Sequence, residues 1–187
     1  MNTQQSYLVG LSIGDGNLSN PNGRATRLRI TCDNKYPKLI VRITKTIQDV
    51  FPENSISVIK RRDNCVDISC YSNKLEALLG WSAESGSKFE QNISVPLCIL
   101  ENVELTKFCL RGLIETDGSV YIDRTYLTVN FVTIIPNLAK DVAYMISNLG
   151  YISNTQTFKP KIGELKYTVR ISRSAKQFIE TVGIDKS

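Results

Sequence analysis

The same nine-residue pattern occurs twice in this chain. Leu8–Gly16 (LVGLSIGDG) and Leu110–Gly118 (LRGLIETDG) both read L-x-G-L-x-x-x-D-G. The residues after each copy also correspond, because each copy precedes an alternating segment, a proline-led amphipathic segment, a hairpin and a short segment that ends in glycine. Similarity of this kind between two parts of one chain indicates two copies of one structural unit within the 187 residues.

The segments after the first copy have the periodicities of strands and helices. Residues 27–33 alternate polar and apolar side chains, as a half-buried strand does, and residues 37–51 begin at a proline and carry an amphipathic helical pattern. Residues 55–71 predict a hairpin that turns near Asp63, and residues 72–80 predict a serine-led short helix that ends in glycine. The second copy has counterparts at residues 126–132, 136–150, 154–172 and 174–183.

This order predicts an α+β fold. We expect two pseudo-symmetric αββαββα repeats, each with a curved antiparallel sheet, packed against each other through the two motif helices. The expected boundaries are residues 1–86 for the N-terminal repeat, 87–106 for a connector and 107–187 for the C-terminal repeat.

Small residues in the motifs predict how the two helices pack. Gly10 and Gly14 lie one helical turn apart, so a second helix backbone can approach closely there, and Gly112 and Thr116 hold the same positions in the second copy. The last glycine of each motif, Gly16 or Gly118, is expected to end its helix in a left-handed conformation.

Histidine is absent from the sequence. Its absence excludes serine–histidine and cysteine–histidine nucleophile pairs, histidine-ligated zinc and histidine general bases. The five cysteines form no C-x-x-C pair, so neither a zinc knuckle nor a complete disulfide framework is indicated. We expect reduced, mostly buried thiols.

The formal net charge of +5 and the isoelectric point near 8.9 permit a polyanionic partner without requiring one. The first residues lack the basic and apolar regions of a secretion signal, and no run of about 18 apolar residues occurs. We therefore expect a soluble intracellular protein with no membrane partner, in a bacterial or archaeal cytoplasm or an organelle matrix.

The acids of the two motifs are the candidate metal ligands. Asp15 and Asp117 stand at the negative end of a helix dipole, where a carboxylate is electrostatically disfavoured. A divalent cation would reverse that penalty. Two carboxylates brought together across a symmetric seam are expected to bind magnesium, which prefers oxygen ligands and keeps several waters.

Both copies resemble the signature of the LAGLIDADG homing endonucleases, in the form that carries two motifs in a single chain. The signature positions are met by Leu8, Gly10, Leu11, Asp15, Gly16, Leu110, Gly112, Leu113, Ile114, Asp117 and Gly118. The sequence departs from the signature at Ser12, Ile13, Gly14, Glu115 and Thr116. None of these departures is the penultimate acid.

The resemblance implies a monomeric, metal-dependent DNA endonuclease. Such an enzyme hydrolyses both strands of a long target in double-stranded DNA and leaves short 3′ overhangs, without a small-molecule cofactor. It uses Mg²⁺, with Mn²⁺ as a substitute, and Ca²⁺ is expected to support binding without cleavage.

The resemblance also assigns roles to residues of this chain. Asp15 and Asp117 become catalytic metal ligands, joined by the backbone carbonyls of Gly14 and Thr116. A lysine after each repeat assists near the scissile phosphate, and the candidates are Lys88 and Lys186, with Lys60 and Lys159 in reserve.

Alternation along the strands predicts the surface that reads DNA. Apolar residues face the helices, which leaves a polar set of donors and acceptors suited to base edges in the major groove on the opposite face. Two such sheets side by side would cover roughly 20 base pairs, and their different sequences predict a non-palindromic target. The residues expected to contact DNA are Arg27, Arg29, Thr31, Asp33, Arg61, Asp67, Ser69, Tyr71, Tyr126, Thr128, Asn130, Gln156, Lys166, Thr168 and Arg170.

Two other functions use the same scaffold. One is an intron maturase that binds RNA, and the other is a catalytically inert DNA-binding regulator; retention of both acids speaks against each. Intein-borne relatives carry splicing residues that include histidine, so a free-standing intron-encoded or phage-like product is the expected context.

Overall fold

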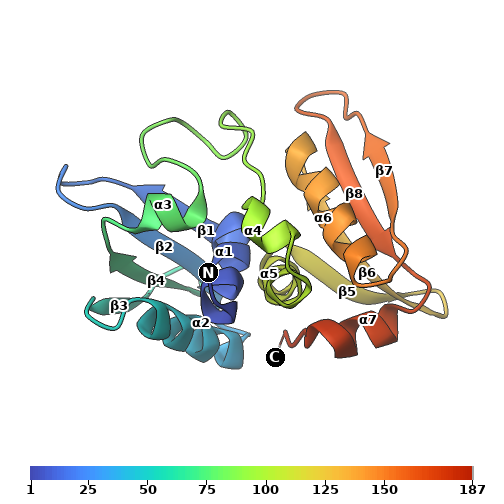
Figure 1. The fold of residues 1–187 in the computed structure, drawn as a ribbon, viewed down its shortest axis with the longest axis horizontal. Helices are drawn as coiled ribbons and strands as arrows, with labels where there is room; N and C mark the ends of the chain where they lie inside the picture. Colours follow the sequence, from blue (N-terminus) through green and yellow to red (C-terminus); the bar gives the residue numbers. More distant parts are fainter. Residues whose placement is uncertain (187) are drawn as a thin grey trace.

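The computed structural model describes residues 1–186 and confirms two α+β repeats around a central pair of helices (Figure 1). The first repeat contains α1 (Thr3–Asp15), β1 (Gly16–Ser19), β2 (Arg27–Asp33), α2 (Pro37–Val50), β3 (Ile56–Lys60), β4 (Cys65–Tyr71) and α3 (Leu75–Leu79). After α4 (Leu97–Leu100), the second repeat contains α5 (Val103–Thr116), β5 (Gly118–Asp123), β6 (Tyr126–Thr133), α6 (Pro136–Asn148), β7 (Asn154–Phe158), β8 (Lys166–Ile171) and α7 (Ala175–Val182). The order αββαββα therefore occurs twice.

Each repeat has one four-stranded antiparallel sheet. The strand orders are β1-β2-β4-β3 and β5-β6-β8-β7, so the two sheets share one topology. The first strand of each sheet begins at the last glycine of the motif, where Gly16 pairs with Ile30 and Gly118 pairs with Phe131. Each motif acid therefore stands at the junction between a motif helix and an edge strand.

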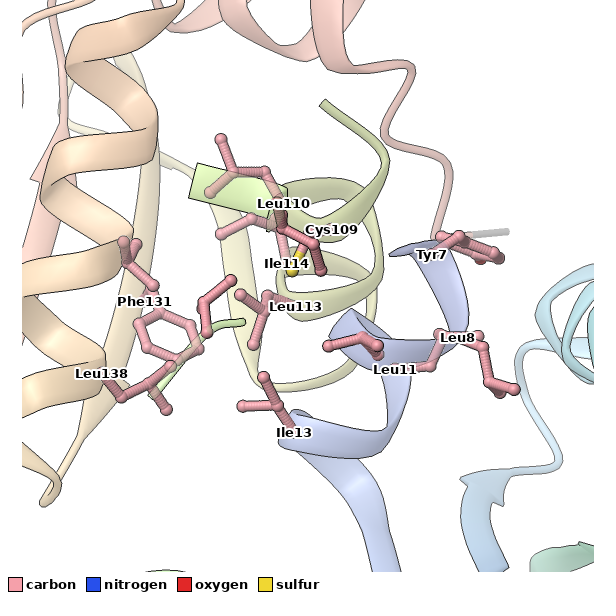
Figure 2. Close-up of a cluster of buried hydrophobic side chains, with 14 of the residues drawn as sticks. Tyr7, Leu8, Leu11, Ile13, Cys109, Leu110, Leu113, Ile114, Phe131 and Leu138 are labelled. Atoms are coloured by element: carbon pink, nitrogen blue, oxygen red, sulfur yellow. The ribbon is translucent and has the colours of Figure 1, made fainter. Parts of the chain in front are cut away.

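The motif helices α1 and α5 pack at backbone distance, as the glycines predict. A Cβ added to Gly10 would lie 2.1 Å from the carbonyl oxygen of Cys109, and one added to Gly112 would lie 2.6 Å from the backbone nitrogen of Leu11. Figure 2 shows Leu11 and Ile13 of α1 beside Leu113 of α5. This seam is part of a continuous apolar core that joins the repeats.

The expected left-handed termini are wrong for both motif glycines. Gly16 has an extended backbone with φ of −78°, and Gly118 is not among the glycines with positive φ. Both positions need glycine for space instead. A Cβ on Gly16 would lie 2.4 Å from the carbonyl oxygen of Ser12, and one on Gly118 would lie 2.6 Å from the Cα of Ile114.

The segment between the repeats contains more structure than a simple connector. α5 begins at Val103, inside the range 87–106 expected for the connector, and Asn102 caps it by accepting hydrogen bonds from the backbone of Glu104 and Leu105 at 3.0 and 3.1 Å.

All five cysteines are free thiols, and Cys32, Cys70 and Cys109 are buried. Over residues 1–186, no helix is long and apolar enough to cross a bilayer.

Candidate active site and nucleic-acid interface

The two motif acids lie together at the end of the seam. Asp15 is the last residue of α1, and Asp117 caps α5, with its N–H donating to the carbonyl of Leu113 at 3.0 Å. Both side chains reach solvent, yet protein surrounds them closely. Burial and then the charge of Asp117 raise the pKa of Asp15 to about 6, and burial raises the pKa of Asp117. Two carboxylates at two helix C-termini thus repel one another.

Lys88 reaches this site from the segment after the first repeat. Its Nζ donates to the carbonyls of Ser12, Ile13 and Gly14 at 2.9, 2.7 and 2.6 Å. These are carbonyls of the last turn of α1, where the helix dipole favours a cation, and the Ser12 carbonyl also accepts from the N–H of Gly16. Burial lowers the pKa of Lys88 to about 8, whereas Asp117 and Asp15 act in the opposite direction.

Lys186 holds the corresponding place in the second repeat. Its Nζ donates to the carbonyl of Thr116 at 3.3 Å and to that of Gly118. Burial lowers its pKa, while the charges of Asp15 and Asp117 raise it. The structure therefore brings Asp15, Asp117, Lys88 and Lys186 together. It places the reserve candidates elsewhere: Lys60 ends β3, and Lys159 follows β7, both exposed in their hairpins.

The donor set at the seam fits a hard divalent cation. Two carboxylates that raise each other's energy, next to backbone carbonyls, are the ligands that Mg²⁺ prefers, with water completing its shell. Gly14 and Thr116 directly precede the two acids in the chain, so their carbonyls could join the carboxylates, although each carbonyl also accepts from a lysine. Among the described residues, no group of three or more histidine, cysteine, aspartate or glutamate side chains could hold a metal, so carbonyls and water would have to supply the remaining ligands.

A pocket of about 290 Å³ opens beside Asp117. Gly14, Lys88 and Asp117 line it, together with Val132, Thr133 and Lys166 of the second sheet. Lys166 was expected to contact DNA, and the structure places it next to the acidic site.

The outer face of the first sheet carries the predicted polar residues in register. Arg27, Arg29, Thr31 and Asp33 alternate with buried apolar residues along β2, and they pair with Tyr71, Ser69, Asp67 and Cys65 of β4. Thr31 donates to Asp67 at 2.7 Å, and Arg61 lies 3.5 Å from the same carboxylate. The predicted residues of this sheet thus share one face.

On the outer face of the second sheet, one of the residues predicted to contact DNA is buried. Asn130 pairs with Arg170 and donates to the Tyr121 hydroxyl at 2.7 Å. Thr128 lies on the same face but is fully buried, because neighbouring side chains, including the Arg170 guanidinium 3.5 Å from its hydroxyl, cover it. The expected contact between Thr128 and DNA is therefore wrong for this arrangement. The remaining predicted residues of this sheet are accessible: Tyr126, Gln156, Lys166, Thr168 and Arg170.

The edge strands β1 and β5 correspond to no segment predicted from the sequence. Their outward residues Asn17, Ser19, Ser119 and Tyr121 extend the two polar faces, since they pair with the outward residues of β2 and β6. The signal was available for β5, because GSVYID alternates polar and apolar residues directly after the motif. β1 has only four residues, too few for a clear period.

Comparisons with known proteins agree with this architecture. Residues 106–183 match the family model of the LAGLIDADG-like domain. The crystal structure of I-DmoI in complex with DNA and Mn has a TM-score of 0.68 at 22% identity, over 96% of this chain and 96% of that chain. The N-terminal LAGLIDADG domain of DUF199/WhiA has a TM-score of 0.62 at 12% identity, over 100% of this chain and 86% of that one.

One curated relative is much longer than this chain. The ATP-dependent DNA helicase Hel308 of Thermococcus kodakarensis is 30% identical over 158 residues, which are 82% of this chain and 13% of the helicase.

Residues 106–183 therefore match a LAGLIDADG-like domain. In particular, the chain has the fold of the LAGLIDADG homing endonucleases in the single-chain, double-motif form, similar to I-DmoI.

Proposed function

We propose that this chain is a site-specific endonuclease that hydrolyses both strands of double-stranded DNA with divalent metal ions. One observation carries the proposal: two aspartates, each with a lysine against the adjoining helix end, meet at the seam between two polar sheet faces. Such an arrangement offers two related reaction centres, one for each strand of a duplex. Because both centres belong to one chain, we expect an active monomer.

The protein's own groups have separable roles in this reaction. Asp15 and Asp117, with the carbonyls of Gly14 and Thr116, would hold Mg²⁺ or Mn²⁺. When bound, the ions activate water and stabilise the charge on the scissile phosphate and the departing 3′ oxygen. Lys88 and Lys186 add a positive charge at each centre, and hydrogen bonds to carbonyls at the ends of α1 and α5 hold both ammonium groups.

The two sheet faces support recognition of a long target. Arginine, asparagine and threonine side chains stand outward on both sheets, the second sheet adds a glutamine, and these side chains distinguish base edges. The formal charge of +5 favours a polyanion. Since the residues differ between the two faces, we propose a non-palindromic site of roughly 20 base pairs. Short 3′ overhangs are proposed for the products.

The test begins by selecting the target from a library of random duplexes, as fragments cut in the presence of Mg²⁺. We expect the purified protein to nick and then linearise a plasmid that carries the selected site. Asp15→Asn and Asp117→Asn should each abolish double-strand cleavage while binding survives, whereas Asp49→Asn, the same change on an exposed position of α2, should cut normally. EDTA should stop cleavage, and Ca²⁺ should support binding alone. Undiminished cleavage in EDTA would contradict the metal role.

The same assays separate the alternatives. A protein that binds duplex DNA in Mg²⁺ without cutting it would be a regulator. A protein that prefers structured intron RNA over every duplex in the library would be a maturase. Either result would replace the proposed nuclease.

A further inference from the structure

A buried carboxylate joins the two repeats beside the candidate active site. Glu115, two residues before Asp117 in the chain, is 1% exposed. It accepts hydrogen bonds from the Tyr7 hydroxyl, from Arg111 Nε at 2.9 Å and from the backbone N–H of Asp185 at 2.9 Å, and it pairs with Arg42 at 3.2 Å. A buried charge needs such a complete set of partners. In the sequence, Glu115 is only a departure from the signature.

Arg42 connects this network to the first repeat. It belongs to α2, and its guanidinium donates to the Tyr7 hydroxyl at 3.1 Å and to the backbone carbonyl of Asp185, and it pairs with the Asp185 carboxylate at 3.3 Å. A planar guanidinium can engage several oxygens in a fixed geometry. Figure 1 shows the chain running from α7 toward α2, beneath α5. Arg42 and Glu115 therefore hold the backbone of Asp185 between the two repeats.

The next residue is Lys186, whose ammonium donates to the carbonyls of Thr116 and Gly118. Fixing the backbone of Asp185 limits where that ammonium can go. Lys88, in the other half, is fixed differently: the side chain of Gln91 bonds the backbone of Ser82 and Gly86 at 2.9 Å, so its loop is closed by local contacts. The two pseudo-symmetric lysines thus depend on different supports.

We propose that Arg42 and Glu115 are positioning residues for Lys186, so that an arginine of the first repeat controls the reaction centre of the second. The effect on catalysis rests on the proposed nuclease function, whereas the positioning of Lys186 can be measured without it. The network predicts an asymmetry: loss of Arg42 should disturb one reaction centre and leave the other intact.

The first measurement needs no DNA. Hydrogen exchange at the Asp185 amide and acylation of lysine amines, both read by mass spectrometry, are compared in the wild-type chain and in Arg42→Met. We expect the Asp185 amide to exchange and Lys186 to react roughly tenfold faster in the variant, the scale of one lost charge-assisted hydrogen bond. Lys88 serves as the internal control and should be unchanged. Lys38→Met, which removes an exposed charge from the same helix, should change neither lysine.

The second measurement follows each strand of a cleavage substrate labelled at both ends. In Arg42→Met, one strand should be cut about tenfold more slowly under single turnover, so that nicked DNA accumulates, while target affinity stays unchanged. Arg42→Lys should recover part of the rate, because it restores the charge without the guanidinium fork. Gln91→Ala should slow the opposite strand.

The outcomes are distinguishable. Unchanged exchange and labelling at Asp185 and Lys186 would overturn the positioning role, whether or not the protein cuts DNA. Equal slowing of both strands would overturn the asymmetry. A wild-type chain that cuts no DNA would remove the proposed function but not the exchange result. If Arg42→Met does not fold, the exchange and labelling of Arg42→Lys and Glu115→Gln are compared with the wild-type chain instead.

Discussion

Adding a single methyl group at Gly10 tests whether the seam sets the distance between the repeats. The new Cβ of Gly10→Ala would lie 2.1 Å from the carbonyl oxygen of Cys109, whereas side-chain carbons in proteins essentially never come closer than 3.0 Å. The obstacle is backbone, so no rotamer change relieves it. The helices α1 and α5 would have to separate by roughly 1 Å or shift along each other.

The expected loss of stability follows from two opposing effects. Overpacking in a well-packed core costs about 1 to 3 kcal/mol, and a backbone obstacle belongs at the upper end of that range. Replacing glycine by alanine inside a helix returns about 1 kcal/mol. The net change is a loss of about 2 kcal/mol, which corresponds to a fall in Tm of roughly 4 to 8 °C for a chain of this size.

Thermal and urea unfolding measure this loss, and Gly14→Ala provides a matched comparison. There the obstacles are side-chain atoms of Thr116, with Oγ1 at 2.0 Å from the added Cβ. Thr116→Gly should therefore rescue Gly14→Ala in part, whereas no side-chain change at the seam should rescue Gly10→Ala. If Gly10→Ala were as stable as the wild type, or more stable, the close packing of the motif helices would not be what fixes the repeats.

Three further results are expected. In EDTA, Asp15→Asn should raise the free energy of unfolding by about 1 kcal/mol above pH 6, because burial makes the ionised carboxylate costly in the folded state; partial exposure of the side chain keeps this cost small. The gain should vanish below about pH 4, where the carboxyl is protonated in both the folded and the unfolded state. A gain that persists there would contradict the assigned cause. Arg29→Ala should weaken target binding by about 1 to 3 kcal/mol, since within residues 1–186 its Nε is buried with no partner. Thr128→Val, at a covered position, should leave the affinity for the target unchanged. Equal losses of affinity for the two variants in DNA-binding titrations would refute the assignment of the exposed face. Affinity should also fall steeply with salt through phosphate contacts, and a flat response would favour a different kind of partner.

Periodic patterns explain why so much of the fold was predictable. The proline-led helices α2 and α6, the alternating strands β2 and β6 and the closure of each repeat by a short helix all follow from local side-chain order. Left-handed φ values at Gly80 and Gly183 agree with the expected ends of α3 and α7. The failure at Gly16 has a physical reason: a glycine required by a close contact and one required by a positive φ look identical in sequence.

Contacts distant in sequence explain what local reasoning missed. The alternation of β6 gives the face of Thr128 correctly, but its cover comes from Arg170 on another strand. Similarly, no pattern near Glu115 indicates that Arg42, far along the chain in the other repeat, completes its set of partners.

The sequence by itself determined the duplication, the paired aspartates, the glycines that let two helices meet and the polar alternation of the strands, because each of these depends on neighbours within a few residues. Only the tertiary structure decided which lysines reach the acids, which outward side chains stay accessible and how Asp185 is held between the repeats. Those outcomes depend on the packing of segments that are remote in the chain, and a local pattern does not encode the distance between them.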